Sequence, residues 1–157
     1  MATLTQGIFK AYDIRGIIDK TLDAGIARDI GRAFGTAALA KGEKTVVIGR
    51  DGRLSGPELG KALAEGLQSV GVDVIDLGVV ATPMLYFATH MLDTQSGIMV
   101  TGSHNPPDYN GFKMVLAGEA IYGETIQALY QAIIDGKLKD GAGTYRTHDI
   151  AAAKSVS

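Results

Sequence analysis

Short apolar runs alternate with segments of helical periodicity along most of this chain. The runs at 45–48, 72–76 and 96–100 are predicted to be strands of a buried sheet. Around them, apolar residues recur every three or four positions, which is the spacing of one face of a helix. This spacing predicts helices at about 22–41, 55–70, 82–91 and 126–134.

The second of these helices carries signals for its first turn. Ser55 and Glu58 match the S-x-x-E pattern, in which the serine side chain caps the backbone N–H groups of the first turn. Pro57 fits the same turn, because the N–H that proline lacks has no partner there. We therefore expect the helix to begin here and to bury Leu59, Leu63, Leu67 and Val70.

The order of these elements predicts the fold class. Strands joined through helices run parallel with right-handed crossovers, so the loops at 49–56, 77–82 and 101–111 should share one edge of the sheet. The run at 112–116 follows the third loop without a helix, so it should return antiparallel. We predict an α/β fold: a three-layer α/β/α domain with a small mixed, mostly parallel sheet. Ligands of such sheets bind beyond the carboxyl ends of the strands.

The apolar pattern weakens after about residue 135. A length of 157 residues suits one domain with a sizeable core. We predict a single domain over residues 1–135 and, over 136–157, a linker toward a second domain that this chain lacks.

Composition narrows the classes of partner. The net charge is −2 and no run of Lys and Arg occurs, so we expect no nucleic-acid partner. No run of 18 apolar residues occurs, so we expect no membrane partner. The chain has no cysteine, and its N-terminus lacks the pattern of a signal peptide; we expect it to be cytoplasmic.

The loop T-G-S-H-N-P-P-D-Y-N-G-F-K at 101–113 concentrates the candidate chemistry. Gly102 allows a turn without a Cβ clash, and two prolines after Asn105 stiffen the backbone. Ser103 is thereby held on a rigid loop whose N–H groups could bind an anion, and Lys113 could add a positive charge. Strand alternation places Lys113 on the face opposite Phe112.

From these residues alone, three interpretations of the loop stay open. Serine, asparagine, glycine and proline are common turn formers, so the loop could be purely structural. It could bind anions without catalysis. The neighbouring Ser103 and His104 could also form a hydrolase pair, although adjacency in sequence does not guarantee contact.

Three motifs in order resemble one family. The segment 101–113 resembles the phosphoserine loop of the α-D-phosphohexomutases, specifically the bacterial phosphomannomutase/phosphoglucomutase group. F-K-A-Y-D-I-R-G at 9–16 is similar to that family's N-terminal active-site segment, and G-R-D-G-R-L-S-G at 49–56 to its second glycine-rich loop. The resemblance covers about residues 1–150.

The resemblance implies a reaction and a cofactor. In this family a phosphoserine gives its phosphoryl group to a mannose or glucose 1- or 6-phosphate. The resulting 1,6-bisphosphate turns over in the site and returns its other phosphate to the serine. Carried over, Ser103 is the phosphorylated residue, and its phosphoryl or hydroxyl oxygen is a ligand of Mg²⁺, which neutralises charge during transfer.

The same match assigns roles to five further residues. His104 and Lys113 would assist proton transfer or charge balance, and Arg15 would steady the transferring phosphoryl group. Tyr12 and Asn105 would help to shape the substrate site, although Tyr12 could simply pack the N-terminal segment.

A second group of polar residues lies in the glycine-rich loop at 49–56. We interpret Arg50, Asp51 and Arg53 as residues that brace this loop rather than contact substrate.

The chain departs from the family in length. Members have four domains, and the Asp-rich metal loop, the sugar-recognition loop and the phosphate-binding loop of the later domains are absent here. We therefore expect domain 1 of such a mutase, essentially inactive alone, with the remaining domains of the parent enzyme as its partners. The alternative is a non-catalytic α/β module that binds anions or partner domains.

Overall fold

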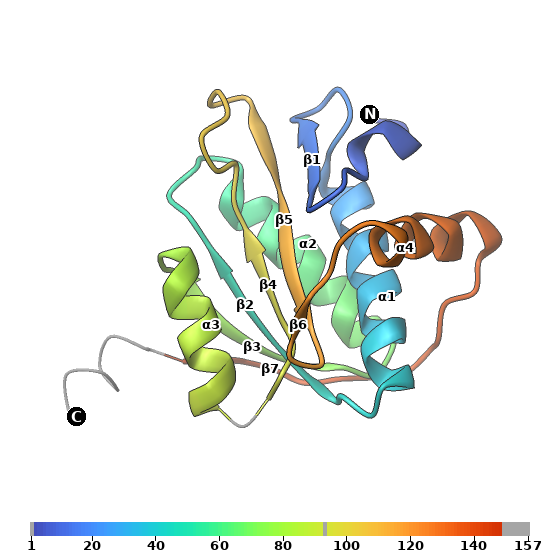
Figure 1. The fold of residues 1–157 in the computed structure, drawn as a ribbon, viewed down its shortest axis with the longest axis vertical. Coiled ribbons are helices and arrows are strands. Elements are labelled where there is room, and N and C mark those ends of the chain that lie inside the picture. The colour runs from blue at the N-terminus through green and yellow to red at the C-terminus, as the bar shows by residue number, and fades with distance from the viewer. Residues whose placement is uncertain (1, 93, 149–157) are drawn as a thin grey trace.

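One mixed sheet organises the structure, a computed structural model that describes residues 2–92 and 94–148 (Figure 1). The sheet has seven strands in the order β1-β5-β4-β2-β3-β7, and β6 pairs with β5 outside this path. The strands are β1 (Ile14–Ile17), β2 (Thr45–Arg50), β3 (Asp73–Val79), β4 (Gly97–Val100), β5 (Tyr109–Leu116), β6 (Glu119–Ala120) and β7 (Tyr145–Thr147).

Helices cover both faces of this sheet, which confirms the predicted three layers. One face buries the larger core against α1 (Ala24–Ala40) and α2 (Gly56–Ser69), and α4 (Glu124–Asp135) packs on α1. The other face buries a smaller apolar cluster under α3 (Thr82–Met91). Strand alternation separates the two cores: Val46 and Ile48 of β2 belong to the first, and Val47 to the second. A short 3₁₀ turn, Gln6–Ile8, precedes β1.

The strand directions also agree with the sequence prediction. β4, β2, β3 and β7 run parallel to one another, whereas β5 returns antiparallel beside β4. The sequence pattern did not predict β1, which pairs antiparallel with β5 and places Arg15 opposite Gly111. The N-terminal segment therefore joins the sheet next to the strand that follows the serine-containing loop.

The predicted serine cap of α2 is wrong. The backbone of Ser55 is already helical, with φ −78° and ψ −10°, and its side chain makes no capping hydrogen bond. Instead its Oγ accepts a hydrogen bond of 2.9 Å from Nδ2 of Asn110, which is fully buried. A buried amide needs partners, so the serine hydroxyl satisfies this side chain of β5 instead of the first turn of the helix.

Part of the predicted linker is ordered into the sheet. Residues Tyr145–Thr147 form β7, which runs parallel to β3 from Val74 to Asp76. The domain boundary at residue 135 stays a prediction, and residues 149–157 of the predicted linker lie outside the described residues. Within the described part of the chain, no helix is long and apolar enough to span a membrane.

Candidate active site

The candidate site is built on two loops at one edge of the sheet. The serine loop, defined here as residues 101–108, joins β4 to β5, and residues 51–55 join β2 to α2 (Figure 1). Because β2 and β4 are parallel neighbours with Arg50 opposite Val100, both loops leave the sheet side by side. Two backbone hydrogen bonds join the segments at this edge. The N–H of Asp51 donates to the carbonyl of Val100 at 3.0 Å, and the N–H of Thr101 donates to the carbonyl of Gly111 at 2.9 Å.

Ser103 lies exposed on the serine loop in an unusual backbone conformation. Its φ is +52°, in the left-handed region that side chains disfavour. Its N–H donates to Oγ1 of Thr101 at 3.0 Å. Such strained residues persist only where the surrounding structure holds them, and they concentrate at functional sites.

Gly102 avoids a Cβ clash, as predicted, and the group that a Cβ would meet is the Arg53 side chain. Its φ is not among the positive values of the chain, so a left-handed turn does not explain the glycine. A Cβ at this position would lie 2.1 Å from Cζ of Arg53. The glycine therefore allows the Arg53 side chain to pass against the backbone of the serine loop.

Arg53 binds the serine loop through four backbone carbonyls. Its Nη1 donates to the carbonyl oxygens of Pro106 at 2.6 Å and Tyr109 at 3.0 Å. Its Nη2 donates to those of Ser103 at 3.0 Å and Asn105 at 2.7 Å. The arginine thus holds the serine loop from Ser103 to the start of β5.

Asp51 holds the first residues of the same loop. Its Oδ2 accepts from Oγ1 of Thr101 at 2.9 Å and from the N–H of Gly102 at 3.2 Å, and lies 3.6 Å from Nε of Arg53. Its Oδ1 accepts from the N–H of Arg53 at 3.1 Å, which also braces its own loop. The sequence predicts only that Asp51 and Arg53 brace their own loop; in the structure both also support the serine loop.

Arg15 and Asn105 lie together beside the serine loop. Nη1 of Arg15 donates to Oδ1 of Asn105 at 3.4 Å, and Nδ2 of Asn105 donates to the carbonyl of Gly102 at 2.9 Å. Both line a pocket of about 450 Å³ between the serine loop and the N-terminal segment. An arginine beside the serine loop supplies the positive charge that a phosphate or phosphoryl group requires.

The other candidate residues are more dispersed. His104 is exposed next to Ser103, but no hydrogen bond joins the two side chains within residues 2–92 and 94–148. Lys113 is opposite Met99 on the α3 face of β5, the face predicted for it. Tyr12 is 78% exposed and packs beside Tyr122, with ring centroids 6.4 Å apart. The structure thus associates Tyr12 with the segment before α4.

The described residues do not form a magnesium site by themselves. No group of three His, Asp or Glu side chains with metal-binding geometry occurs in the described ranges. The carboxylate of Asp51, which contacts the serine loop, already accepts hydrogen bonds from Thr101, Gly102 and Arg53. Mg²⁺ requires about six oxygen ligands, and Ser103 would supply one.

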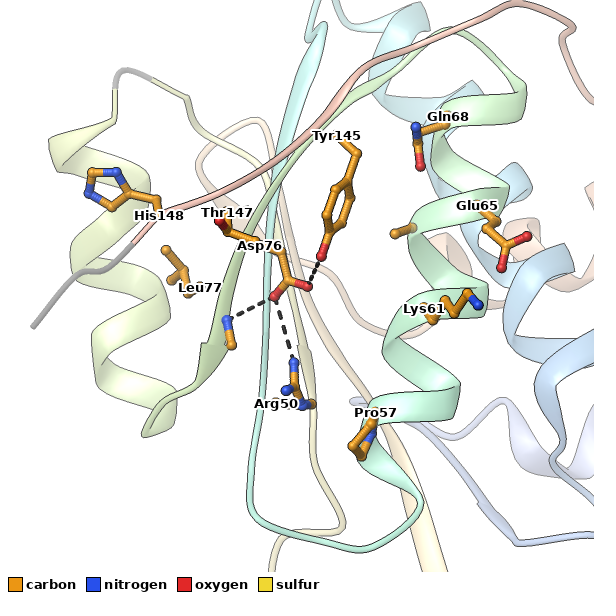
Figure 2. A pocket seen from close by; sticks show the side chains of 12 residues that line it. Arg50, Pro57, Lys61, Glu65, Gln68, Asp76, Leu77, Tyr145, Thr147 and His148 are labelled. Carbon is orange, nitrogen blue, oxygen red and sulfur yellow. Dashed lines mark hydrogen bonds and ion pairs between the residues drawn. The ribbon is translucent and has the colours of Figure 1, made fainter.

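A larger pocket of about 760 Å³ lies between α2 and β7 (Figure 2). The sequence pattern did not indicate it, and no residue of the serine loop lines it. Figure 2 shows Asp76 at its centre, 3.8 Å from Nη1 of Arg50 and accepting hydrogen bonds from the Tyr145 hydroxyl and, at 2.8 Å, the Gly78 N–H. Arg50 therefore points toward this pocket and away from the serine loop.

This pocket gives a pH-dependent prediction. Burial, followed by the hydrogen bond and the negative charge of Asp76, raises the pKa of Tyr145 from 10.0 to about 12, while Arg50 opposes the shift. A raised folded-state pKa stabilises the fold below pH 10, and that contribution is lost as the pH rises from about 10 to about 12. Because Tyr145 is 47% exposed, solvent screens the effect and it should be small.

We expect Tyr145→Phe to be less stable than the wild type below pH 10, with the difference disappearing toward pH 12. Denaturant unfolding across this pH range measures it. Asp76→Asn is the control, because it should bring the phenol pKa back toward its ordinary value in an ultraviolet titration. A stability difference that did not change with pH would contradict the assignment.

Comparisons with known proteins agree with this geometry. Residues 6–140 match the family model of phosphoglucomutase/phosphomannomutase, alpha/beta/alpha domain I. The chain is 55% identical to a phosphomannomutase/phosphoglucomutase of Pseudomonas aeruginosa over 94% of its own length and 32% of that protein. It is 48% identical to a phosphoglucomutase of Neisseria gonorrhoeae, over 98% of its own length and 36% of that protein.

A solved structure extends the comparison to three dimensions. A phosphoglucomutase/phosphomannomutase family protein from Burkholderia thailandensis superposes with a TM-score of 0.93 at 56% identity, covering 97% of this chain and 35% of that one. The chain thus spans about a third of the length of the relatives it matches. It belongs to the phosphoglucomutase/phosphomannomutase family, of which it forms the alpha/beta/alpha domain I.

Proposed function

We propose that this chain is the phosphoryl-carrying domain of a phosphomannomutase/phosphoglucomutase, with Ser103 as the carrier. The observation that carries the proposal is Ser103 itself, exposed at φ +52° on a loop held through its backbone. The loop leaves the hydroxyl free toward solvent while fixing the chain on either side. This arrangement suits a group that must accept and return a phosphoryl group without moving.

The proposed reaction has two balanced transfers. A hydroxyl of a bound hexose 1- or 6-phosphate attacks the phosphorus of phospho-Ser103; the P–Oγ bond breaks, and the hydroxyl proton passes to a base. The bisphosphate then presents its other phosphate, Oγ of Ser103 attacks it, and the sugar oxygen leaves with a proton. Phosphoryl transfer needs mainly positioning and charge stabilisation, which suits a rigid loop.

The neighbouring residues take proposed roles in this scheme. Arg15, joined to the serine loop through Asn105, is proposed to steady the phosphoryl oxygens. His104 and Lys113 are proposed to move a proton or balance charge, and Tyr12 and Asn105 to shape the sugar site. Ser103 is proposed to give Mg²⁺ a single oxygen, with the other ligands coming from outside this chain.

The proposed enzyme also needs domains that this chain does not contain. Since the chain spans about a third of its relatives, the remaining domains are proposed to supply sugar and phosphate recognition. The chain alone is proposed to be essentially inactive. A cytoplasmic location is proposed, because a chain without cysteine does not depend on an oxidising compartment to form disulfide bonds.

A chimeric enzyme tests this proposal. Residues 1–148 of this chain would replace the corresponding first third of the Pseudomonas aeruginosa relative, to which it is 55% identical. We expect the chimera to interconvert hexose 1- and 6-phosphates, measured by coupled assay, and the isolated chain to be inactive. A folded chimera without mutase activity would favour the alternative, a non-catalytic module that binds anions or partner domains.

A further inference from the structure

Arg53 directs four of its five N–H donors to backbone carbonyl oxygens. A guanidinium group has five N–H donors in a fixed fork and accepts nothing. Four of these donors meet the carbonyls of Ser103, Asn105, Pro106 and Tyr109, and Nε lies 3.6 Å from the Asp51 carboxylate. Within the described residues the Nε–H makes no hydrogen bond and lies beside the Asp51 carboxylate, and neither terminal nitrogen has a donor left for a substrate phosphate.

The positive charge of Arg53 is also balanced by the carboxylate of Asp51. The Arg53 side chain is 15% exposed and that of its ion-pair partner Asp51 27%. The two groups form a nearly neutral pair beneath the serine loop, with Asp51 holding Thr101 and Gly102 and Arg53 holding the following residues. An arginine near a phosphoryl site would ordinarily be assigned to anion binding, but this one faces backbone oxygens.

Ser103 needs such support. Its φ of +52° is disfavoured for any residue with a side chain, so the loop would relax if the carbonyls on either side were released. Arg53 binds the carbonyl of Ser103 itself and that of Asn105, two residues later. Gly102 allows this contact because a Cβ there would collide with the guanidinium.

We propose that Arg53 is a positioning residue that holds Ser103 in its left-handed conformation through the backbone of the serine loop, without contacting substrate. The inference rests on the proposed function for its catalytic consequence, but the conformational part stands on the loop alone. The fork geometry is essential to it. A lysine keeps the positive charge, but its single ammonium group cannot span four carbonyls.

The test uses Arg53→Lys in this chain, with Arg28→Lys as the matched control on the exposed side of α1. Two readouts follow the loop directly: the ¹³Cα chemical shift of Ser103, which reports its φ, and amide exchange at Asn105 and Tyr109, whose N–H groups are hydrogen-bonded within the loop. In Arg53→Lys we expect the shift to move toward its unstructured value and both amides to exchange at least tenfold faster. Amides of β2 should keep their rates.

A second variant keeps the proposal testable if Arg53→Lys does not fold. Asp51→Asn keeps an oxygen acceptor for the loop but removes the charge opposite Arg53, and it should change the same readouts by a smaller factor. In the chimera, Arg53→Lys should lower kcat by about 100-fold while leaving KM for the hexose phosphate nearly unchanged, because the misplaced group is the carrier and not the binding site.

The outcomes separate the two proposals. An unchanged Ser103 shift and unchanged exchange in folded Arg53→Lys would overturn the positioning role, whatever the activity of the chimera. If Arg53→Lys changed the Ser103 shift and the amide exchange but left kcat of the chimera unchanged, the proposed catalytic effect of Arg53 would be overturned. An inactive wild-type chimera would count against the proposed function alone, and the loop readouts would still decide the role of Arg53.

Discussion

Replacing Ser103 with alanine is expected to abolish mutase activity in the chimera while leaving the domain folded. Without Oγ there is no atom to carry the phosphoryl group between the two positions of the sugar. Loss of a covalent carrier removes the pathway itself, so we expect a decrease on the order of 10³-fold or more. A coupled mutase assay measures it, and intact mass tests whether a phosphoryl group is present on the wild-type protein only.

The fold should tolerate this change. Ser103 is exposed, and the serine loop is held through backbone atoms that alanine retains. We expect a stability within about 0.5 kcal/mol of the wild type, as for other surface substitutions. Ser103→Gly should be equally inactive and no less stable, since glycine adopts φ +52° without steric cost.

Ser69→Ala is the matched control. This serine ends α2 and donates to the carbonyl of Gly66 at 2.7 Å, far along the helix from the serine loop. It should leave the activity of the chimera unchanged. If folded Ser103→Ala kept its activity, Ser103 would not be the phosphoryl carrier. If every variant bound hexose phosphate without turnover, the non-catalytic module would be favoured.

The regular part of the fold was predictable from apolar spacing alone. The strands around Val47, Ile75 and Met99 bury consecutive residues because helices cover both faces of the sheet, so they occur in the sequence as short apolar runs, while the helices beside them keep one apolar face. The antiparallel return of β5 followed from the absence of a helix before it. These features depend on local sequence, so a single chain is enough to infer them.

The missed elements depend on contacts between distant segments. Tyr145–Thr147 is exposed at every position, so it has no apolar pattern, and it forms β7 only because the edge of β3 is available. Ser55 matches a capping pattern, but the buried amide of Asn110, 55 residues away, takes its hydroxyl. In both cases tertiary structure overrides a local signal.

The site was predictable to a similar extent. The serine loop was found because its residues are contiguous, and Arg15 was assigned to the same site only through the family resemblance. The role of Arg53 was not predicted, because its carbonyl partners lie 50 to 56 residues away in the sequence and the residues next to it give no signal of them. The sequence shows only that residue 102 is glycine, and the structure is needed to show that its missing Cβ allows the close approach of the Arg53 guanidinium.

Gly66→Ala is expected to cost about 3 kcal/mol of stability, at the upper end of overpacking effects. Gly66 is the point where α2 crosses α1: a Cβ there would lie 2.1 Å from the carbonyl oxygen of Arg28 and 3.1 Å from the N–H nitrogen of Arg32. Both are backbone atoms of α1 and cannot rotate away. From the facing helix, a Cβ on Gly31 would likewise lie 2.4 Å from the carbonyl oxygen of Leu63.

Gly60→Ala, in the same helix, makes the same chemical change with the opposite expected result. Its Cβ would meet nothing closer than Cδ of Arg50 at 4.0 Å, so only the better helix propensity of alanine remains, which should stabilise the domain by about 0.5–1 kcal/mol. Thermal unfolding should show Gly66→Ala melting roughly 6–12 °C below the wild type and Gly60→Ala slightly above it. If both variants shifted in the same direction, the close crossing of α1 and α2 would not be what requires glycine at this position.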